Sequence, residues 1–388
     1  MTVNPAAPPF SAPMRIALLI SGTGVNGVAM HCLLLVQYLL SRGHRVLLLH
    51  RPGAWIADRP GLDGAEKFVT SFGRSPGELI RVTKRLNAFK PEVLHTHMSS
   101  AHTYGMLARI LSRRPVVATA HSTSLQLHWW FNNRVIATSP DAEAHHIKVN
   151  RVSRRAMRMI PSFIDTRSFP VIGDDERSAA REALGLPQDA FVIGCVGDIC
   201  ERKRQIDVVR ALANVLKTEP KARLLLVGGR FKEYFDELTK VVDELGVASQ
   251  LITTGSRNDV PALLAAMDAF VLASRKESSP LAVLEAMSRG LPVIASDVGM
   301  LSDFVAENVT GHVVQVGDVD AISRHLIALA ADPERRKAMG DAAQATARTK
   351  YDMSVLAPQT EAVLREAAAI KNRPWLGFAA ELCGTSPS

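Results

Sequence analysis

The chain has 388 residues, 47% of them hydrophobic and 22% charged, which indicates a globular protein long enough to form two domains. No apolar run reaches the roughly 20 residues that a membrane-spanning helix needs, so we expect no such helix. Neither a disulfide nor a metal site is indicated by the spacing of Cys32, Cys195, Cys200 and Cys383, and we therefore expect a cytoplasmic location.

The net charge of +8 is unevenly distributed, with +13 in residues 1–168 and −5 in residues 169–388. A basic half favours an anionic partner such as a membrane surface, a nucleic acid or a phosphorylated substrate. The alternative is a charged surface that serves only solubility.

The first half of the chain alternates strands with helices. Residues 1–13 lack the basic and apolar segments of a secretory signal, and we interpret them as a flexible leader. Apolar runs predict strands at 15–21, 46–50, 91–97 and 115–121, with an amphipathic helix after the first and third of them. This alternation predicts a parallel sheet that helices cover on both faces.

The second half repeats the pattern, with strands at 189–199, 222–229, 269–274, 292–296 and 311–316. We therefore predict an α/β protein with two Rossmann-like domains, residues 14–168 and 188–350, that face a central cleft. The polar, proline-bearing segment 169–187 is expected to be the linker. Residues 351–388 are expected to form a terminal helix and a tail that return toward the N-terminal domain.

Ligands of open parallel sheets bind beyond the carboxyl ends of the strands, so we examined the residues that follow each strand. In the segment KESSPLAVLEAM, Ser279 is expected to cap a helix that starts at Pro280, which leaves the N–H groups of Leu281 and Ala282 for a phosphate. Glu285 could accept hydrogen bonds from a ribose, and Glu277 could hold sugar hydroxyls. The alternatives are a salt-bridge partner for Glu285 and a plain surface position for Glu277.

Two further segments are candidates for contact with phosphates. Arg202 and Lys203 follow a strand, where adjacent cations suit a diphosphate, although they could equally start a solvated helix. Gly27, in the loop GTGVNG, would let the backbone approach a ligand, and Asn26 tolerates a positive φ. A glycine loop alone indicates a turn more often than a nucleotide site.

Three histidines end two strands on the same side: His95, His97 and His121. Imidazole suits zinc, but no carboxylate or cysteine joins the three at ligand spacing, so we predict no metal. His121 could hydrogen-bond a substrate hydroxyl, with a structural role as the alternative.

A possible membrane-facing surface is indicated less clearly by the sequence. Arg81, Lys84 and Arg85 lie on a basic amphipathic stretch, and Trp129 and Trp130 follow closely after His121. Basic and aromatic side chains together suit the interface of an anionic membrane, while the alternative places the aromatic side chains in the domain core.

In combination these segments resemble the GT-B glycosyltransferases of the retaining family GT4, over about residues 14–366. The most specific stretch is ESSPLAVLEAMSRGLPVIASDVGMLSDFVAENVTGHVVQVGD, with its two glutamates eight residues apart. NGVAMHCLLLVQYLLSRGHRV, PEVLHTH, PVVATAH and MIPSFIDTRSF are similar to further segments of that family.

The resemblance implies a role for each candidate residue. Lys203 and the Gly27 loop would contact the diphosphate of the donor, and the backbone of Leu281 and Ala282 its phosphate oxygens. Glu285 would hold the ribose and Glu277 the transferred sugar. On the same basis, His121 would lie near the reacting sugar, Arg257 would frame the nucleobase, and His97 would lie on the acceptor side.

One position departs from the family pattern. Asp198 stands where the family often has an arginine, and a carboxylate there would repel a diphosphate. Arg202 is a candidate to supply the missing charge.

The expected function is that of a retaining glycosyltransferase that needs neither a metal nor a cofactor. It would move a sugar from a nucleotide-diphosphate sugar to a lipid-linked or lipopolysaccharide-type glycan, at the cytoplasmic face of the inner membrane. The alternatives are a sugar-nucleotide epimerase on the same scaffold and a non-catalytic sugar-nucleotide binder. No nucleic-acid partner is expected, since no recognised binding motif is present.

Overall fold

A computed structural model describes residues 12–370 of the chain, which divide into two compact units. The first unit comprises the chain up to Pro161 together with the chain from Met353 onward, and the second unit is Ser162–Asp352. Nearly all of the predicted leader, and the tail beyond residue 370, lie outside the described residues. None of the helices found in residues 12–370 is both long enough and apolar enough to cross a membrane.

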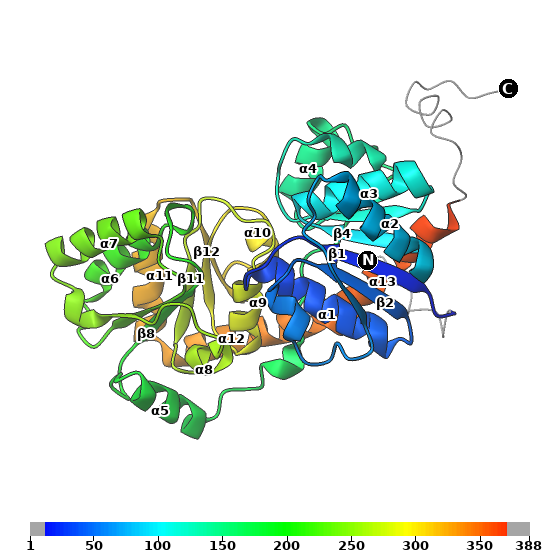
Figure 1. The fold of residues 1–388 in the computed structure, drawn as a ribbon. Helices are drawn as coiled ribbons and strands as arrows, with labels where there is room; N and C mark the ends of the chain where they lie inside the picture. Colours follow the sequence, from blue (N-terminus) through cyan, green and yellow to red (C-terminus); the bar gives the residue numbers. More distant parts are fainter. Residues whose placement is uncertain (1–11, 371–388) are drawn as a thin grey trace. The chain divides into compact units, whose positions relative to one another are not determined.

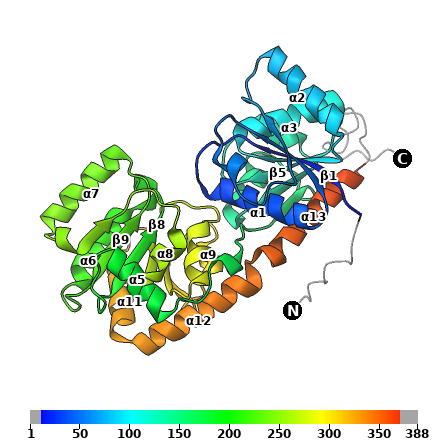
Figure 2. The same cartoon turned by 60° about the horizontal axis from the view of Figure 1, so that its bottom comes forward.

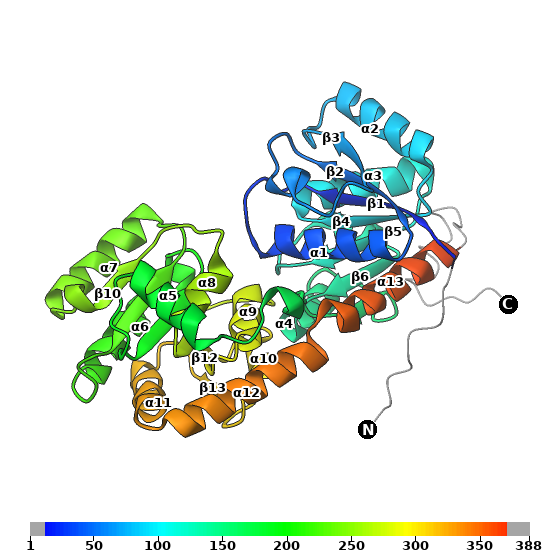
Figure 3. The same cartoon turned by 90° about the horizontal axis from the view of Figure 1, so that it is seen from below.

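The first unit is built on a seven-stranded parallel sheet (Figure 1). In spatial order its strands are β3 (Glu66–Val69), β2 (Arg45–His50), β1 (Arg15–Ile20), β4 (Val93–His97), β5 (Val116–Ala120), β6 (Arg134–Ala137) and β7 (Met157–Met159). Its helices are α1 (Gly27–Ser41), η1 (Trp55–Asp58), α2 (Pro76–Phe89), α3 (Ser99–Ser112), η2 (Leu127–Phe131), α4 (Pro140–Lys148) and α13 (Met353–Ala369). Figure 3 shows α2 and α3 on one face of the sheet and α1 and α13 on the other.

The second unit repeats this architecture with a six-stranded parallel sheet. Its strands, again in spatial order, are β10 (Leu251–Thr253), β9 (Arg223–Val227), β8 (Val192–Val196), β11 (Ala269–Leu272), β12 (Val293–Ser296) and β13 (Gly311–Val314). Its helices are η3 (Thr166–Ser168), α5 (Asp174–Ala183), η4 (Glu201–Lys203), α6 (Gln205–Val215), α7 (Lys232–Glu244), η5 (Ala248–Gln250), α8 (Val260–Ala265), α9 (Leu281–Ser288), α10 (Leu301–Phe304), α11 (Val319–Ala331) and α12 (Pro333–Lys350).

The central strands are buried on both faces, which explains their continuous apolar sequences. All residues of β5 and β8 are buried, as are all of β1 and β2 except the first residue of each. Both sheets follow the doubly wound strand order, in which the chain starts in the middle and changes direction once. The change falls between β1 and β4 in the first sheet and between β8 and β11 in the second. Ligands of such sheets bind at this point.

The segment 169–187 differs from the predicted linker because it belongs to the second unit. It contains α5, whose Arg181 is buried and donates to Asp268 over 2.7 Å, and Arg177 donates to the same carboxylate over 2.6 Å. The polar residues of this segment, which suggested a linker, include the two arginines that pair with the buried Asp268. The boundary between the units therefore precedes residue 168 and lies at Pro161.

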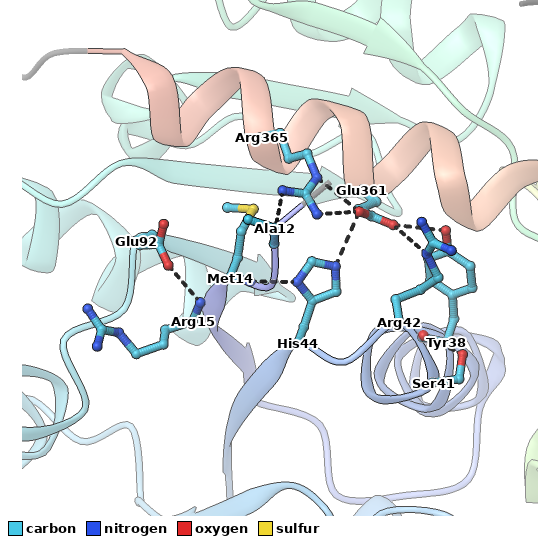
Figure 4. A network of polar contacts seen from close by, with 10 residues as sticks. All are labelled: Ala12, Met14, Arg15, Tyr38, Ser41, Arg42, His44, Glu92, Glu361 and Arg365. Carbon is cyan, nitrogen blue, oxygen red and sulfur yellow. Dashed lines mark hydrogen bonds and ion pairs between the residues drawn. The ribbon is translucent and has the colours of Figure 1, made fainter. Parts of the chain in front are cut away.

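The helix α13 completes the first unit and lies beside α1 (Figure 2). Its Glu361 is 5% exposed and accepts hydrogen bonds from Tyr38 Oη at 2.9 Å and from Arg365 Nη2 at 2.7 Å (Figure 4). His44 Nε2 lies 3.2 Å and Arg42 Nε 3.6 Å from the same carboxylate. Burial opposes ionisation of Glu361, but the hydrogen bonds from Arg365 and Tyr38 outweigh it and hold its pKa below the usual value.

Replacing this carboxylate should destabilise the first unit. We expect Glu361→Gln to lower the free energy of unfolding by about 2 kcal/mol at pH 7, because it leaves partly buried cations without their counter-ion. Since the folded-state pKa is lowered, the contribution of Glu361 is present above its unfolded pKa and is lost as the pH falls through the folded pKa. Urea unfolding at pH 7 and pH 4 measures both effects.

Glu366→Gln is the matched control, because Glu366 lies on the same helix and also pairs with two arginines, Arg134 and Arg158. The side chain of Glu366 is 42% exposed, so its loss should cost less than about 1 kcal/mol. Equal losses in the two variants would contradict a special role for Glu361.

Candidate functional site

A cluster of charged side chains lies at the switch point of the second sheet. Lys203 ends η4, just after β8, and Glu277 follows β11, the strand beside β8. Glu277 Oε1 lies 2.8 Å from Lys203 Nζ and accepts hydrogen bonds from Arg202 Nη1 at 2.6 Å and Ser274 Oγ at 2.8 Å. The structure thus brings Glu277 against two adjacent cations, of which Arg202 lies 75 positions earlier in the sequence, so that one carboxylate faces two positive charges.

Two glycines let the backbone come close to these side chains. Gly197 has φ +143°, and a methyl group on it would lie 3.2 Å from Cε of Lys203. Gly299 has φ +62°, and a methyl group there would overlap the carbonyl oxygen of Glu277 and lie 2.7 Å from that of Ser278. Any larger residue at Gly299 would therefore displace the segment that carries Glu277.

The helix α9 starts one residue later than predicted. Its N-cap is Pro280 rather than Ser279, and no side chain of the described residues caps it. Ser279 Oγ instead accepts a hydrogen bond from the backbone N–H of Ser162 at 2.8 Å. Within residues 12–370, no side chain caps the first N–H groups of α9, on Leu281 and Ala282, and such groups are suited to bind an anion.

Glu285 lies in the middle of α9 and is only partly exposed. Within residues 12–370 no hydrogen bond or ion pair is formed by its carboxylate, so the alternative of a salt-bridge partner is wrong. Desolvation raises the pKa of Glu285 to about 7. A half-buried carboxylate without a protein partner is suited to accept hydrogen bonds from a ligand, such as a pair of hydroxyls.

Arg257 and Asp198 also lie at the carboxyl edge of this sheet. Arg257 follows β10 and donates to Asp259 through Nε at 2.7 Å. Asp198 is exposed, and its backbone carbonyl accepts from Gln205 Nε2 at 2.9 Å. Arg202, which was expected to compensate for Asp198, has its guanidinium on Glu277 and on the carbonyl of Lys276.

In the first unit, Gly27 is the first residue of α1, as the strand–loop–helix pattern indicated. Asn26 caps the helix by accepting from the N–H of Ala29 at 3.0 Å, with φ −159°. Asn26 is thus extended rather than at positive φ, and its role is that of an N-cap.

His121 lines a cavity of about 360 Å³ at the switch point of the first sheet. The rest of its lining is Ser21, Val28, Met98, Ser99, Ser100, His102, Ser122, Ser124 and Trp129. His97, the last residue of β4, is fully buried and lies behind His121, with its Nδ1 3.0 Å from His121 Nε2. His97 therefore positions His121 and does not line this cavity.

A third histidine, missed in the sequence, joins this pair. Ring nitrogens of His31, His97 and His121 all lie within 4.8 Å of one another, which is close enough to hold a metal ion. Burial lowers the pKa of all three, to about 4 for His31. However, one ring nitrogen of His97 and one of His121 already face each other at hydrogen-bond distance.

The residues predicted to face a membrane differ in their exposure and in their ion pairs. Trp129 is 3% exposed and packs on His102, His128 and His146, so the core alternative is correct for it, whereas Trp130 is 50% exposed. Two of the cations on α2 form ion pairs with carboxylates of the first unit. Arg81 binds Glu78 at 2.9 Å and Arg85 binds Glu66, while Lys84 is exposed and forms no ion pair within the described part of the chain.

Sequence reasoning missed Ser274, Gly299 and His31. Ser274 was placed at the end of a predicted strand, and its position three residues before Glu277 was the available signal. Gly299 lies in a loop whose contact with Glu277 depends on tertiary structure. His31 looked like one polar residue in the apolar run of α1, and only the sheet brings it to His97.

Comparison with known proteins follows the division of the chain. Residues 176–346 match the sequence model of the family described as Glycosyl transferases group 1, and residues 25–168 match that of Glycosyltransferase Family 4. The two matches coincide with the parts of the two units that hold the clusters described above.

Among curated relatives, the GDP-mannose-dependent monoacylated alpha-(1-6)-phosphatidylinositol monomannoside mannosyltransferase of Corynebacterium glutamicum is 31% identical over 214 residues. That alignment covers 53% of this chain and 55% of the relative. The UDP-Gal:alpha-D-GlcNAc-diphosphoundecaprenol alpha-1,3-galactosyltransferase of Escherichia coli is 27% identical over 275 residues, which are 66% of this chain and 70% of the relative. The chain thus spans little more than half of the first relative's length.

Among solved structures, Anabaena Alr3699/HepE in complex with UDP and glucose has a TM-score of 0.79 at 22% identity. The match covers 91% of this chain and 100% of that one. A glycosyltransferase from Rickettsia africae has a TM-score of 0.84 at 15% identity over 93% of this chain and 100% of that one. At these identities the likeness concerns the fold alone.

The raised pKa of Glu285 predicts a pH-dependent cost to stability. An acid whose pKa rises from 4.5 to about 7 on folding destabilises the fold progressively between those values, and above pH 7 by about 3 kcal/mol. We expect Glu285→Gln, which cannot ionise, to be more stable than the wild type at pH 8 and to lose this advantage toward pH 4.5. Urea unfolding across this pH range is the measurement.

Glu237→Gln, a change on the exposed face of α7, is the control and should not alter the pH dependence. An advantage of Glu285→Gln that is the same at pH 5 and pH 8 would contradict the desolvation of Glu285.

Proposed function

Because the chain belongs to glycosyltransferase family 4, we propose that it transfers a sugar from a nucleotide-diphosphate sugar to a hydroxyl group of an acceptor. The observation that best supports this reaction is the convergence of Lys203, Arg202 and Glu277 at a sheet switch point. Glu277 lies four residues before Leu281, the first residue of α9. The named relatives support the donor class, since one is GDP-mannose-dependent and the other uses UDP-Gal.

The chemical task is the departure of a nucleoside diphosphate from the anomeric carbon. The bond from that carbon to the phosphate oxygen breaks, a bond to the acceptor oxygen forms, and the acceptor proton passes to the departing phosphate. Lys203, Arg202 and the first N–H groups of α9 stabilise the negative charge that develops on the leaving group. This arrangement supports transfer on one face of the sugar, with retention of the anomeric configuration.

Glu277 has two functions in this scheme. It fixes the two cations in place through its hydrogen bonds, and it offers its carboxylate to hydroxyls of the transferred sugar. Ser274 donates to the same oxygen at 2.8 Å and restricts the rotation of the carboxylate. Glu285 binds the ribose of the donor, which gives its desolvated carboxylate the hydroxyl partners that the protein lacks.

The acceptor is proposed to be a lipid-linked or cell-envelope glycan. The two relatives support this, because their names specify a phosphatidylinositol mannoside and a diphosphoundecaprenol-linked sugar as acceptors. His121, in its cavity beside His97, is proposed to lie near the acceptor hydroxyl. The cytoplasm is the proposed location, since sugar nucleotides are the donor.

The donor is identified by thermal unfolding with UDP-, GDP- and ADP-sugars. A ligand present at 100 times its Kd stabilises the folded state by about 2.7 kcal/mol, so the matching donor should raise the Tm by several degrees. Lys203→Met should weaken this effect about tenfold or more in affinity, because it removes a charge-assisted contact to the diphosphate.

Glu277→Gln separates binding from catalysis in the same assay. The change keeps a hydrogen-bonding side chain between Arg202 and Ser274 and makes the site more positive, so donor binding should persist while turnover falls at least about 100-fold. Loss of donor binding in this variant would contradict the proposed roles. Mass spectrometry of the donor incubated with the protein but without acceptor should show no isomerised sugar. An isomerised sugar would indicate an epimerase instead.

No metal ion or cofactor is part of the proposed reaction. The charge of the leaving group is balanced by Lys203, Arg202 and a helix start, which do the work that a divalent cation would do. Transfer should therefore continue unchanged after treatment with a chelator. Activity that disappears with the chelator and returns with magnesium or manganese would overturn this part of the proposal.

Attachment to an anionic membrane is proposed for the first unit. Its support is the net charge of +13 on residues 1–168, with the exposed Lys84 and Trp130 as contacts. Co-sedimentation with phosphatidylglycerol vesicles should be strong at low salt and should fall at high salt. Absence of binding at low salt would remove the membrane from the proposal.

A further inference from the structure

A basic side chain at the carboxyl end of β2 has no counter-ion within residues 12–370. Arg51 directly follows that strand, and its Nη2 donates a long hydrogen bond of 3.3 Å to Ser100 Oγ in the first turn of α3. Its Nε–H is buried and has no hydrogen-bond partner among residues 12–370, and none of the carboxylates described there pairs with it. A partly desolvated guanidinium in this state is stabilised by an anion.

A second arginine is held near the same helix by an ordered loop. Phe72 has φ +51°, which turns the chain so that its ring is buried against Tyr104 at 5.2 Å between centroids. The Tyr104 hydroxyl donates to the carbonyl of Gly73, and the N–H of Gly73 donates to Ser71 Oγ at 3.1 Å. The next residue, Arg74, is exposed and forms no ion pair in the described part of the chain.

Ser100 lies between the two arginines, because it accepts the hydrogen bond from Arg51 and lines two cavities, the smaller of them together with Arg74. One is the cavity of about 360 Å³ that also contains His121, and the other has about 230 Å³. Arg51 itself lines neither cavity and reaches this place through Ser100. The smaller cavity is lined by Phe72, Gly73, Arg74, Leu79, Ser100, Thr103, Tyr104 and Leu107. No carboxylate lines either cavity, although Glu78 is close in sequence, and that carboxylate is bound by Arg81 with its pKa lowered to about 2.

The start of α3 adds to the positive potential at this place. The helix has 14 residues, its N-cap Met98 offers no side-chain acceptor, and its first turn has no acidic residue. The hydroxyls of Ser99 and Ser100 line the larger cavity and can donate there, whereas the Thr103 hydroxyl donates to the carbonyl of Ser99 at 3.2 Å. Two arginines, hydroxyl donors and a helix start together suit the three oxygens of a phosphoryl group.

We propose that Arg51, Arg74 and Ser100 bind a phosphoryl group of the acceptor. This inference rests on the proposed function, since it places the hydroxyl that receives the sugar in the larger cavity near His121. The apolar side of the smaller cavity, formed by Leu79 and Leu107, fits a hydrocarbon portion beside the phosphate. A phosphorylated soluble acceptor and a phospholipid headgroup share this chemistry.

The test measures binding of sn-glycerol 3-phosphate to the full-length protein by titration calorimetry, with glycerol as the neutral counterpart. The Arg51→Met/Arg74→Met variant should bind glycerol 3-phosphate at least about tenfold more weakly than the wild type, because two charge-assisted contacts are lost. Lys203→Met should leave this binding unchanged, since Lys203 belongs to the donor site. Glycerol should not bind measurably to either form.

Arg154→Met/Arg155→Met is the matched control, because it removes two exposed arginines from the same unit. Its binding should equal that of the wild type. Equal weakening in the control would reduce the effect to net charge and overturn the inference, as would wild-type affinity in the Arg51/Arg74 variant. Loss of binding only in Lys203→Met would show that the phosphate occupies the donor site, and this too would overturn it.

If the Arg51→Met/Arg74→Met variant does not fold, a single variant tests the inference instead. Arg74 is exposed, so Arg74→Met alone should fold with an unchanged Tm and still weaken binding several-fold. Vesicles of phosphatidylcholine with and without phosphatidylglycerol distinguish a soluble phosphorylated acceptor from a phospholipid headgroup. If the ligand is a headgroup, the Arg51→Met/Arg74→Met variant should also lose its binding to the vesicles that contain phosphatidylglycerol. The inference fails if neither the soluble phosphate nor the vesicles depend on Arg51 and Arg74.

Failure of the proposed function has a different signature. Hydrolysis of the donor sugar by water needs the donor site but not the acceptor phosphate, so the Arg51→Met/Arg74→Met variant should hydrolyse the donor at the wild-type rate. A protein that neither binds nor hydrolyses any sugar nucleotide contradicts the glycosyltransferase proposal, while the phosphate titration still decides on the site at Arg51.

Discussion

The contact between Lys203 and Glu277 is the interaction on which the site in the second unit depends. It exists because the doubly wound topology makes β8 and β11 neighbours, although a long stretch of chain separates them. Gly197 and Gly299 allow the backbone to lie against the two side chains, so the loops can converge without steric conflict. An excess of positive charge remains after Glu277 is neutralised, and it stands beside a helix start whose N–H groups have no side-chain acceptor.

Both units contain partly buried polar groups that have no hydrogen-bond partner among the described residues. Glu285 is partly buried without a partner, and the Nε–H of Arg51 is buried without one within the described residues. Such groups lower stability, because desolvation is not repaid by hydrogen bonds within the protein. Buried polar groups with structural roles are treated differently, since Glu361 and Asp268 each receive at least two donors.

The sequence predicted the sheets and misplaced details at their edges. Apolar runs such as RIALLI and VIGCV identify buried strands because parallel strands are covered on both faces. Segment 169–187 was interpreted as a linker because its arginines look solvated in sequence, whereas Arg181 is buried on Asp268. Trp129 looked like a surface anchor for a comparable reason, and its histidine neighbours come from three different segments of the chain.

What the sequence by itself determined is the alternation of strands and helices, the glutamates eight residues apart, and the excess of basic residues in the first half. These properties are local or compositional, so hydrophobic periodicity and residue type are sufficient to predict them. Only the tertiary structure decided which charges meet, which remain unpaired, and which histidines gather behind His121. Those outcomes depend on strand order and on contacts between residues far apart in the chain, and a linear pattern contains neither.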